Sequence, residues 1–149
     1  MSGAGAGAAM GAGVGDALRP LEVDVTATHI VAGALATRDF MPVHHDRAYA
    51  NSQGAPDIFM NILSSNAYCC RFLTDWAGPE AMIKKLDIRL GVPVFPGTHL
   101  AFSGTVTSRT EKGSSVLLEV AFRAATDLGD HLTGTAVVDL PAPAGPGRS

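Results

Sequence analysis

The residues best suited to chemistry lie between Arg38 and Arg47, where the sequence reads Arg-Asp-Phe-Met-Pro-Val-His-His-Asp-Arg. Asp39 and His44 are five positions apart, and Pro42 between them restricts the backbone. A carboxylate and an imidazole that converge on one point hold and polarise a water molecule, because an imidazole exchanges protons near neutral pH and a carboxylate orients its partner. With five histidines and 14 acidic residues, about 0.5 pairs with this spacing are expected by chance. The spacing alone is therefore weak evidence, and the surrounding residues must show whether the pair is functional.

Helices are expected on both sides of this segment. Residues Thr28–Arg38 predict a short helix with Thr28 as its N-cap, and Asp46 is placed to cap one helical turn that starts at Arg47. A longer helix is expected from Asp57, as its N-cap, to about Trp76. Apolar residues cover more than half of its circumference, which is typical of a buried helix.

The pattern after Gly78-Pro79 changes from helical to alternating. Four strands are expected, at residues 83–90, 100–107, 116–124 and 132–140, and the last three are joined by short glycine-containing turns. A buried helix followed by an antiparallel meander is an α+β arrangement in which the sheet wraps around the helix, which is the hotdog fold.

The segment Asp39-Phe-Met-Pro-Val-His44 resembles the signature of the MaoC-like enoyl-CoA hydratases, which is Asp, any residue, usually Asn, then Pro, an aliphatic residue and His. The resemblance implies that Asp39 and His44 are the catalytic pair. Met41 departs from the usual Asn, and Thr98 stands where the family often has Asp in Pro-Gly-Asp-Thr. The resemblance extends through most of the core, over residues 35–40, 44–47, 57–63, 74–79 and 89–93.

These segments are most similar to the small catalytic subunit of the heteromeric MaoC-like hydratases of actinobacterial steroid side-chain degradation. The resemblance implies an acyl-CoA substrate with a shortened steroid side chain. It also implies a second MaoC-like hotdog chain as partner, with a homodimer expected when the chain is expressed alone. A lone hotdog sheet leaves an edge strand unpaired, which favours such pairing.

The family's oxyanion site is a backbone amide at the start of the central helix, and here it falls on the N–H of Asn61. Met60, beside it, is a candidate substrate-binding residue. His45 is either a further binding group or a solvated residue. Arg71 and Arg89 either meet the phosphates of coenzyme A or belong to a solvated face. We expect no cofactor and no metal site, because the histidines lack suitable ligand spacing.

The composition is typical of a globular protein in a reducing compartment. The net charge of −3 argues against a nucleic-acid surface, and no run approaches the roughly 18 apolar residues of a membrane span. Cys69 and Cys70 are adjacent, which suits small apolar residues better than a disulfide framework. We therefore expect a cytoplasmic protein. One domain is expected over residues 18–140, between disordered tails at 1–17 and 141–149.

Three functions remain open at this point. The first is hydration of a 2-enoyl-CoA to a 3-hydroxyacyl-CoA. The second is a hotdog acyl-CoA thioesterase, which usually employs a carboxylate on or near the central helix, where this sequence has Asp57 only at the expected start. The third is a non-catalytic acyl-CoA-binding partner subunit, which would have no need of Asp39 and His44.

Overall fold

Five antiparallel strands form one sheet in the order β1-β3-β4-β5-β2 in the computed structural model, which describes residues 8–141. The strands are β1 (Leu21–Asp24), β2 (Met82–Leu90), β3 (His99–Lys112), β4 (Ser115–Thr126) and β5 (Gly129–Pro141). Strands β3, β4 and β5 form the expected meander, with turns at Gly113 (φ 60°) and Gly129 (φ 126°). Both positions lie in the left-handed region that glycine tolerates.

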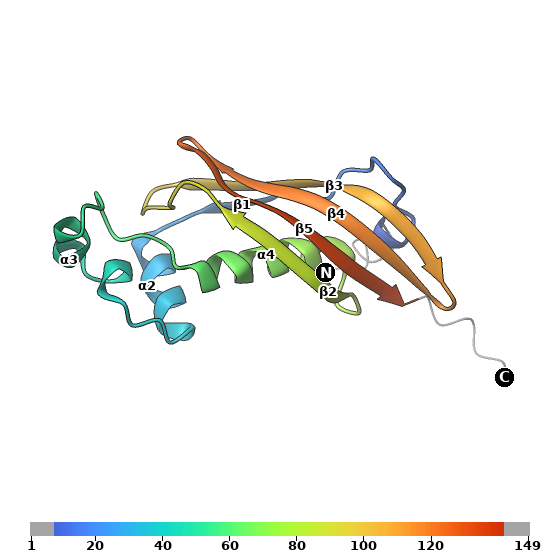
Figure 1. The fold of residues 1–149 in the computed structure, drawn as a ribbon, viewed down its shortest axis with the longest axis horizontal. Helices are drawn as coiled ribbons and strands as arrows, with labels where there is room; N and C mark the ends of the chain where they lie inside the picture. Colours follow the sequence, from blue (N-terminus) through green and yellow to red (C-terminus); the bar gives the residue numbers. More distant parts are fainter. Residues whose placement is uncertain (1–7, 142–149) are drawn as a thin grey trace.

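The long helix α4 (Ile62–Ala77) lies across one face of the curved sheet (Figure 1). Phe72 is fully buried in α4, and its ring lies 5.6 Å from that of Phe102 on β3 and 6.0 Å from that of Phe122 on β4. These contacts carry the helix–sheet core, because aromatic side chains bury large apolar areas. The expected hotdog arrangement, a sheet around a buried helix, is confirmed.

Three short helices gather beyond one end of the sheet (Figure 1). They are α2 (Ala27–Ala36), the 3-10 turn η1 (Pro42–His44) and α3 (Arg47–Ser52). The expected cap of α3 is confirmed, since the Asp46 side chain accepts the N–H of Tyr49. Helix α2 is capped two residues earlier than expected: Thr26, not Thr28, accepts the N–H of His29, and the His29 ring accepts the N–H of Thr26 in return.

The start of α4 also differs from the expectation. The predicted N-cap at Asp57 is wrong, because the helix begins at Ile62 and the side chain of Asn61 caps it. Asp57 instead accepts hydrogen bonds from the guanidinium of Arg47, at 2.8 and 3.2 Å. Residues 57–61 therefore form a non-helical lead-in, and this lead-in brings Phe59 and Met60 to the site described below.

Two features of the N-terminal part were not expected. Strand β1 pairs with the first residues of β3, from Leu21 opposite Phe102 to Asp24 opposite His99. Residues 8–17, expected as part of a disordered tail, pack against the sheet. Ala9 is fully buried there, and Arg109 donates to the carbonyl oxygens of Met10 and Ala12 at 2.8 and 2.9 Å. Residues 1–7 and 142–149 of the expected tails lie outside the described residues.

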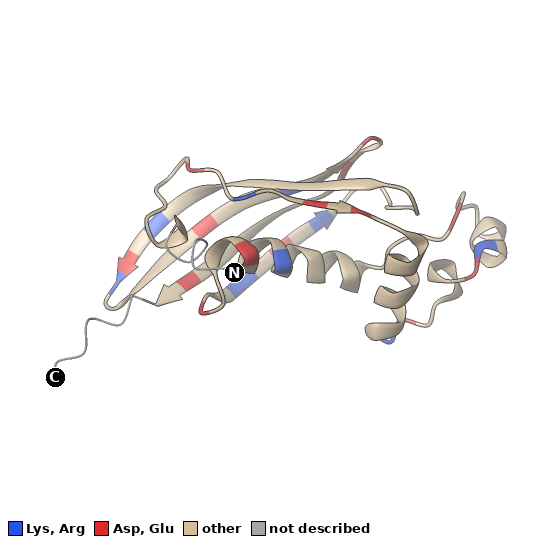
Figure 2. Ribbon diagram, turned by 180° about the vertical axis from the view of Figure 1, so that it is seen from behind, with Lys and Arg blue, Asp and Glu red and all other residues tan. Residues whose placement is uncertain are grey.

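The surface carries both signs of charge. Acidic and basic residues are interspersed along the ribbon in Figure 2. Among residues 8–141, no helix is both long enough and apolar enough to cross a membrane.

Candidate active site

The way in which α2 ends determines the position of Asp39. The N–H of Asp39 bonds to the Ala34 carbonyl at 2.9 Å, and that of Arg38 bonds to the Leu35 carbonyl at 3.1 Å. These two bonds form a Schellman motif, which turns the chain sharply away from the helix axis. Arg38 occupies the left-handed position of the motif with φ 56°, where glycine is usual. The turn places the Asp39 carboxylate beside the start of α4.

His44 ends the turn η1, which Pro42 opens at its first position. Its side chain is nearly buried, and the Phe59 ring contacts it edge-on at 5.0 Å. The Nδ1 atom lies 2.7 Å from the Phe59 carbonyl oxygen. A carbonyl only accepts, so Nδ1 carries a proton, and Nε2 is the nitrogen that can act as an acceptor.

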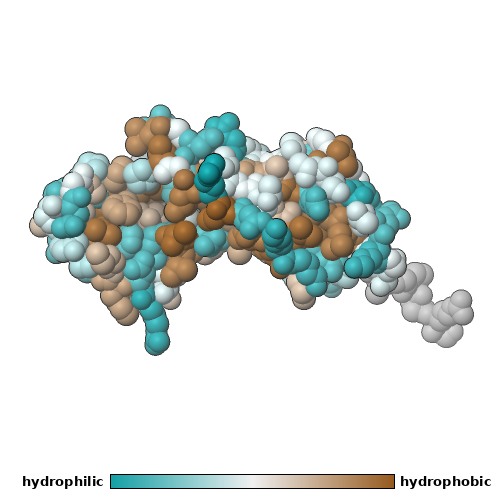
Figure 3. All heavy atoms as spheres, in the orientation of Figure 1, coloured by the Kyte–Doolittle hydropathy of each residue, from teal (hydrophilic) through white to brown (hydrophobic). Residues whose placement is uncertain are grey.

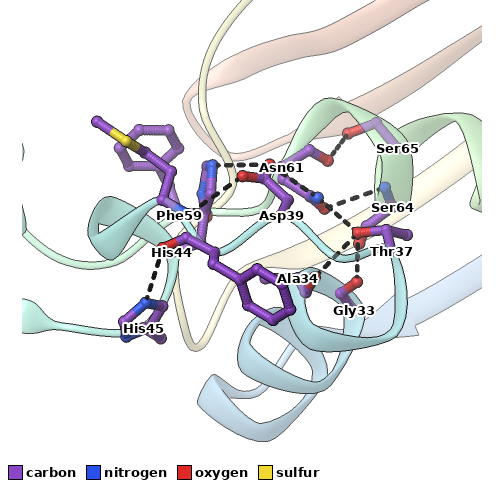
Figure 4. A network of polar contacts seen from close by, with 12 residues as sticks. Gly33, Ala34, Thr37, Asp39, His44, His45, Phe59, Asn61, Ser64 and Ser65 are labelled. Atoms are coloured by element: carbon purple, nitrogen blue, oxygen red, sulfur yellow. Dashed lines mark hydrogen bonds and ion pairs between the residues drawn. The ribbon is translucent and has the colours of Figure 1, made fainter.

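The free nitrogen of His44 faces the carboxylate. Nε2 lies 3.4 Å from Oδ2 of Asp39, as Figure 4 shows. Two acceptors that face each other at this distance suit a water molecule that donates one O–H to each. The pair can therefore bind a water next to a base that is able to take its proton.

Asn61 holds the Asp39 carboxylate in place. Its side-chain amide donates to Asp39 Oδ2 at 3.1 Å and to the hydroxyl of Thr37 at 2.9 Å, and its Oδ1 accepts the N–H of Ser64 at 3.1 Å (Figure 4). The hydrogen bond from Asn61 holds the pKa of Asp39 below its ordinary value, with smaller help from the Met41 N–H and from His44. Asp39 is therefore ionised at neutral pH.

The backbone N–H of Asn61 is a further hydrogen-bond donor at the start of α4. Within residues 8–141, no acceptor takes this N–H, and it lies at the positive end of α4. Asn61 itself is 1% exposed. A free amide at a helix N-terminus is suited to binding a negatively charged oxygen.

A cavity of about 330 Å³ joins these groups. Asp39, His44, Met60 and Asn61, which were predicted as site residues, all line it. Its remaining walls are Phe59, Ile62, the segment Leu90–Pro93 and His131.

Three other predicted residues lie outside this cavity. His45 points away from the pair and contacts the Phe40 carbonyl oxygen through Nε2 at 3.3 Å (Figure 4). Arg71 pairs with Asp75 at 3.4 Å and lines a separate groove between α2 and α4. Arg89 is exposed on β2. The structure does not bring any of these three to the Asp39–His44 pair.

The two departures from the family signature have different surroundings. The side chain of Met41 is half-exposed, while its backbone N–H donates to Asp39 Oδ1 at 3.3 Å. Thr98 is buried in a turn, where its carbonyl accepts the N–H of Val25. The sequence did not predict the side chain of Asn61 as a partner of Asp39, nor that of Thr37 as a partner of Asn61. Their spacing from Asp39 carries no periodic signal.

Cys69 offers no nucleophile. Cys69 is fully buried in α4, and burial raises the pKa of its thiol to about 12. A thiol at that pKa stays protonated at neutral pH, so it behaves as a small apolar side chain.

Two of the side chains that line the cavity, Ile62 and Leu90, are large, apolar and exposed. Figure 3 shows hydrophobic surface in the middle of this face, where the helical end of the molecule meets the sheet. The exposed large apolar residues from the elements around the site are Phe40, Met41, Ile62, Leu63 and Leu90.

Comparison with known proteins gives close matches. Protein-family models do not match the sequence. The chain is 44% identical over 127 residues to the 3-oxo-4,17-pregnadiene-20-carboxyl-CoA hydratase beta subunit of Mycobacterium tuberculosis. The aligned residues cover 85% of this chain and 95% of that protein. A chain of the ChsH1–ChsH2 complex from the same organism superposes with a TM-score of 0.80 at 44% identity, over 86% of this chain and 98% of that one. An (R)-hydratase from A. caviae involved in PHA biosynthesis shares the fold, with a TM-score of 0.79 at 24% identity, over 89% and 100% of the two chains.

Proposed function

This chain belongs to the MaoC-like hydratase family, and we propose that it is the catalytic subunit of a heteromeric hydratase that adds water to a steroid-derived 2-enoyl-CoA. The observation that carries the proposal is the Asp39–His44 pair, in which a free imidazole nitrogen faces a carboxylate at 3.4 Å in the wall of a cavity. The 44% identity to a hydratase beta subunit supports the same reaction.

The reaction follows from the positions of three groups. His44 Nε2 takes a proton from the bound water as the water oxygen bonds to the β-carbon. The electron pair of the double bond moves toward the thioester carbonyl, whose oxygen accepts the N–H of Asn61. Asp39 orients the water and assists return of the proton to the α-carbon, which completes the 3-hydroxyacyl-CoA.

The substrate class is inferred from the relatives and from the surface. The M. tuberculosis relative is named for a steroid carboxyl-CoA, and this chain matches 95% of its length. The exposed apolar side chains of Ile62 and Leu90 in the cavity wall suit a large hydrophobic acyl group or the partner that encloses it.

The partner is inferred from the free edge of the sheet. Strand β2 pairs only with β5 among the described strands, so its outer edge is open. An open edge beside exposed apolar residues favours pairing with another chain. A related chain is found in the ChsH1–ChsH2 complex, which supports a second, different hotdog subunit.

The thioesterase alternative is disfavoured by the central helix. Asp75 is the only carboxylate of α4, and it lies in the last turn in an ion pair with Arg71. Asp57, the other candidate, is held by Arg47. Neither lines the cavity with His44.

A hydration assay tests the proposal. Loss of enoyl-thioester absorbance is followed for the chain alone and for the chain mixed with a second MaoC-like hotdog subunit, while size-exclusion chromatography reports the assembly. We expect a homodimer of the isolated chain and full activity on a steroid enoyl-CoA in the mixed assembly. Thioester hydrolysis without hydration, or full hydration by a monomer, would contradict the proposal.

A further inference from the structure

A buried histidine that the reaction does not employ lines the same cavity as Asp39 and His44. His131 lies near the start of β5 and is 4% exposed. Burial lowers the pKa of its imidazole, so the ring is neutral at physiological pH. A neutral histidine beside a catalytic pair is either a second proton carrier or a positioning group, and its hydrogen bonds distinguish the two roles.

Both ring nitrogens of His131 are occupied. Nδ1 lies 2.7 Å from the carbonyl oxygen of Val92, and Nε2 lies 2.8 Å from the hydroxyl oxygen of Ser65. Because the Val92 carbonyl only accepts, Nδ1 carries the proton, and Nε2 accepts the hydroxyl hydrogen of Ser65. No lone pair remains to face the cavity. His131 is thus unsuited to proton transfer and suited to positioning.

The bonds of His131 tie the cavity wall to the sheet. The N–H of Gly91 donates to the His131 carbonyl at 2.7 Å, and that of Val92 donates to the Asp130 carbonyl at 2.9 Å. The backbone of Gly91 lies so close to that of Asp130 that a Cβ on Gly91 would be 2.2 Å from the Asp130 carbonyl oxygen. The wall formed by Gly91 and Val92 is therefore fixed to β5 by its backbone and by the imidazole.

Ser65 extends this connection to the first turn of α4. Its backbone N–H donates to the Asn61 carbonyl at 3.2 Å, and its hydroxyl oxygen lies 3.3 Å from the same carbonyl (Figure 4). Asn61 in turn holds the Asp39 carboxylate and carries the free N–H. A shift of Ser65 relative to His131 would therefore move both groups relative to the opposite cavity wall.

We propose that His131 and Ser65 form a positioning pair that fixes the first turn of α4, and with it the Asn61 N–H and the Asp39 carboxylate, against the Gly91–Val92 wall. This inference rests on the proposed hydratase function. Neither residue touches the reacting atoms. Their contribution lies in holding the donor and the carboxylate where the transition state needs them, since a displacement of about 1 Å costs up to about a hundredfold in rate.

The chain offers a matched pair of variants for the test. Ser65→Ala removes the hydroxyl that His131 binds. Ser64→Ala removes a hydroxyl from the adjacent residue of the same turn, also buried, whose Oγ has no hydrogen-bond partner among residues 8–141. His131→Asn is the third variant, because its Nδ2 keeps a donor near the Nδ1 position toward Val92 and loses only the bond to Ser65.

The first measurement is steady-state hydration by the complete assembly. We expect Ser65→Ala and His131→Asn to lower kcat and kcat/KM together by between about tenfold and a hundredfold, with KM nearly unchanged, because the lost interaction acts in the transition state. Ser64→Ala should match the wild type. Unchanged kcat in folded Ser65→Ala, or an equal loss in Ser64→Ala, would overturn the proposal.

The second measurement does not depend on turnover. The imidazole ¹⁵N NMR spectrum of the unmodified chain at pH 7 should show His131 as the Nδ1–H tautomer, and Ser65→Ala should shift its Nε2 signal. An Nε2–H tautomer would overturn the pairing whether or not the chain hydrates enoyl-CoA. An inactive wild-type assembly with the expected spectrum would instead reject the hydratase function alone.

Discussion

At the scale of single residues, the side chain of Asn61 connects the start of α4 with the chain that follows α2. Its two N–H bonds go to Asp39 and Thr37, and its Oδ1 accepts the N–H of Ser64. A buried amide with all of these groups paired is held in one orientation. The direction of the Asp39 carboxylate is therefore set by a residue 22 positions later in the sequence.

Removal of the acid–base pair should abolish most hydration. We expect Asp39→Asn and His44→Ala each to lower kcat by about 10²–10⁴-fold, which is the usual contribution of a general acid or base. Circular dichroism should show that both variants stay folded. His45→Gln is the matched control, because this histidine bonds to Phe40 outside the cavity, and its kcat should equal that of the wild type. Near-wild-type turnover in both folded variants would reject the assigned roles.

Replacement of Asn61 by Ser separates capping from positioning. Serine is a good N-cap, so α4 should keep its start, while the donor to Asp39 is lost. The pKa of Asp39 should rise toward its ordinary value, since the bond from Asn61 is the main cause of its depression. We expect kcat to fall about tenfold with little change in melting temperature. A large drop in melting temperature with unchanged kcat would show that Asn61 acts only as a cap.

At the scale of elements, the end of α2 decides where Asp39 lies. The Schellman motif requires a left-handed residue, and Arg38 fills that position although it has a Cβ. The strain is tolerated because Asp39 is bonded on both sides of the turn, through its N–H to Ala34 and through its carboxylate to Asn61. A strained residue next to a carboxylate of the site is common in enzymes.

The stability of variants at Arg38 should depend on how easily the new residue adopts the left-handed backbone angle of this position. Arg38→Gly should raise the free energy of unfolding by about 0.5–1 kcal/mol, because glycine adopts φ 56° without a Cβ clash. Arg38→Val should lower it by about 1 kcal/mol, because a β-branched residue is poorly tolerated there. Arg38→Ala keeps the Cβ without the guanidinium and should resemble the wild type. Urea unfolding measures all three, and equal stability of the Gly and Val variants would contradict the geometry.

The pairing of β1 with β3 carries a pH-sensitive contact. His99 Nδ1 lies 2.7 Å from Asp24 Oδ1 across the two strands, and this hydrogen bond raises the pKa of His99 above its ordinary value. A raised pKa in the folded state means that the contact stabilises the protein below about pH 6.5. The stabilisation is then lost as the pH rises through the folded-state pKa.

The His99→Gln variant tests this contact. Its deficit in unfolding free energy relative to the wild type should be larger at pH 6 than at pH 8, and it should be small at both because the two side chains are exposed. Asp24→Asn should give the same pattern. A deficit that grows from pH 6 to pH 8 would have the wrong sign for a histidine whose pKa is raised.

At the scale of the whole molecule, the N-terminal segment packs against the sheet and is bonded to β3. Gly15 and Leu18 donate to the carbonyl oxygens of Val106 and Gly104 on β3 at 2.8 and 2.9 Å. Together with the contacts of Ala9 and Arg109, these bonds make residues 8–17 part of the folded unit. A Gly- and Ala-rich sequence packs closely because its side chains leave the backbone accessible to Arg109.

Deletion of this segment should therefore destabilise the protein. Removal of residues 1–15 should lower the free energy of unfolding by on the order of 2 kcal/mol, chiefly through the two bonds from Arg109 and the burial of Ala9. That corresponds to a melting temperature about 4–8 °C lower. A chain that lacks only residues 1–7 is the control. Equal melting temperatures of the two truncated chains would show that residues 8–15 contribute nothing.

The sequence by itself determined most of the local elements, and it predicted Asp39 and His44 as a catalytic pair. Helical and alternating periodicities predicted α4 and the four strands from β2 to β5, because one buried face imposes a period of 3.6 on a helix and 2 on a strand. The signature around Asp39 and His44 is equally local, since Pro42 and the turn η1 bring two residues five positions apart to one cavity. The short strand β1 was not predicted, because four residues are too few to show a clear periodicity.

Only the tertiary structure decided what holds the pair. Asn61 reaches Asp39, and His131 reaches both Ser65 and Val92, through contacts between residues that are far apart in the chain. The same holds for Arg109 and the backbone near Ala12. Such polar contacts leave no period in the sequence, because each depends on one side chain and on the path of a distant segment. They are formed only when α4, the Gly91–Val92 wall and β5 pack together.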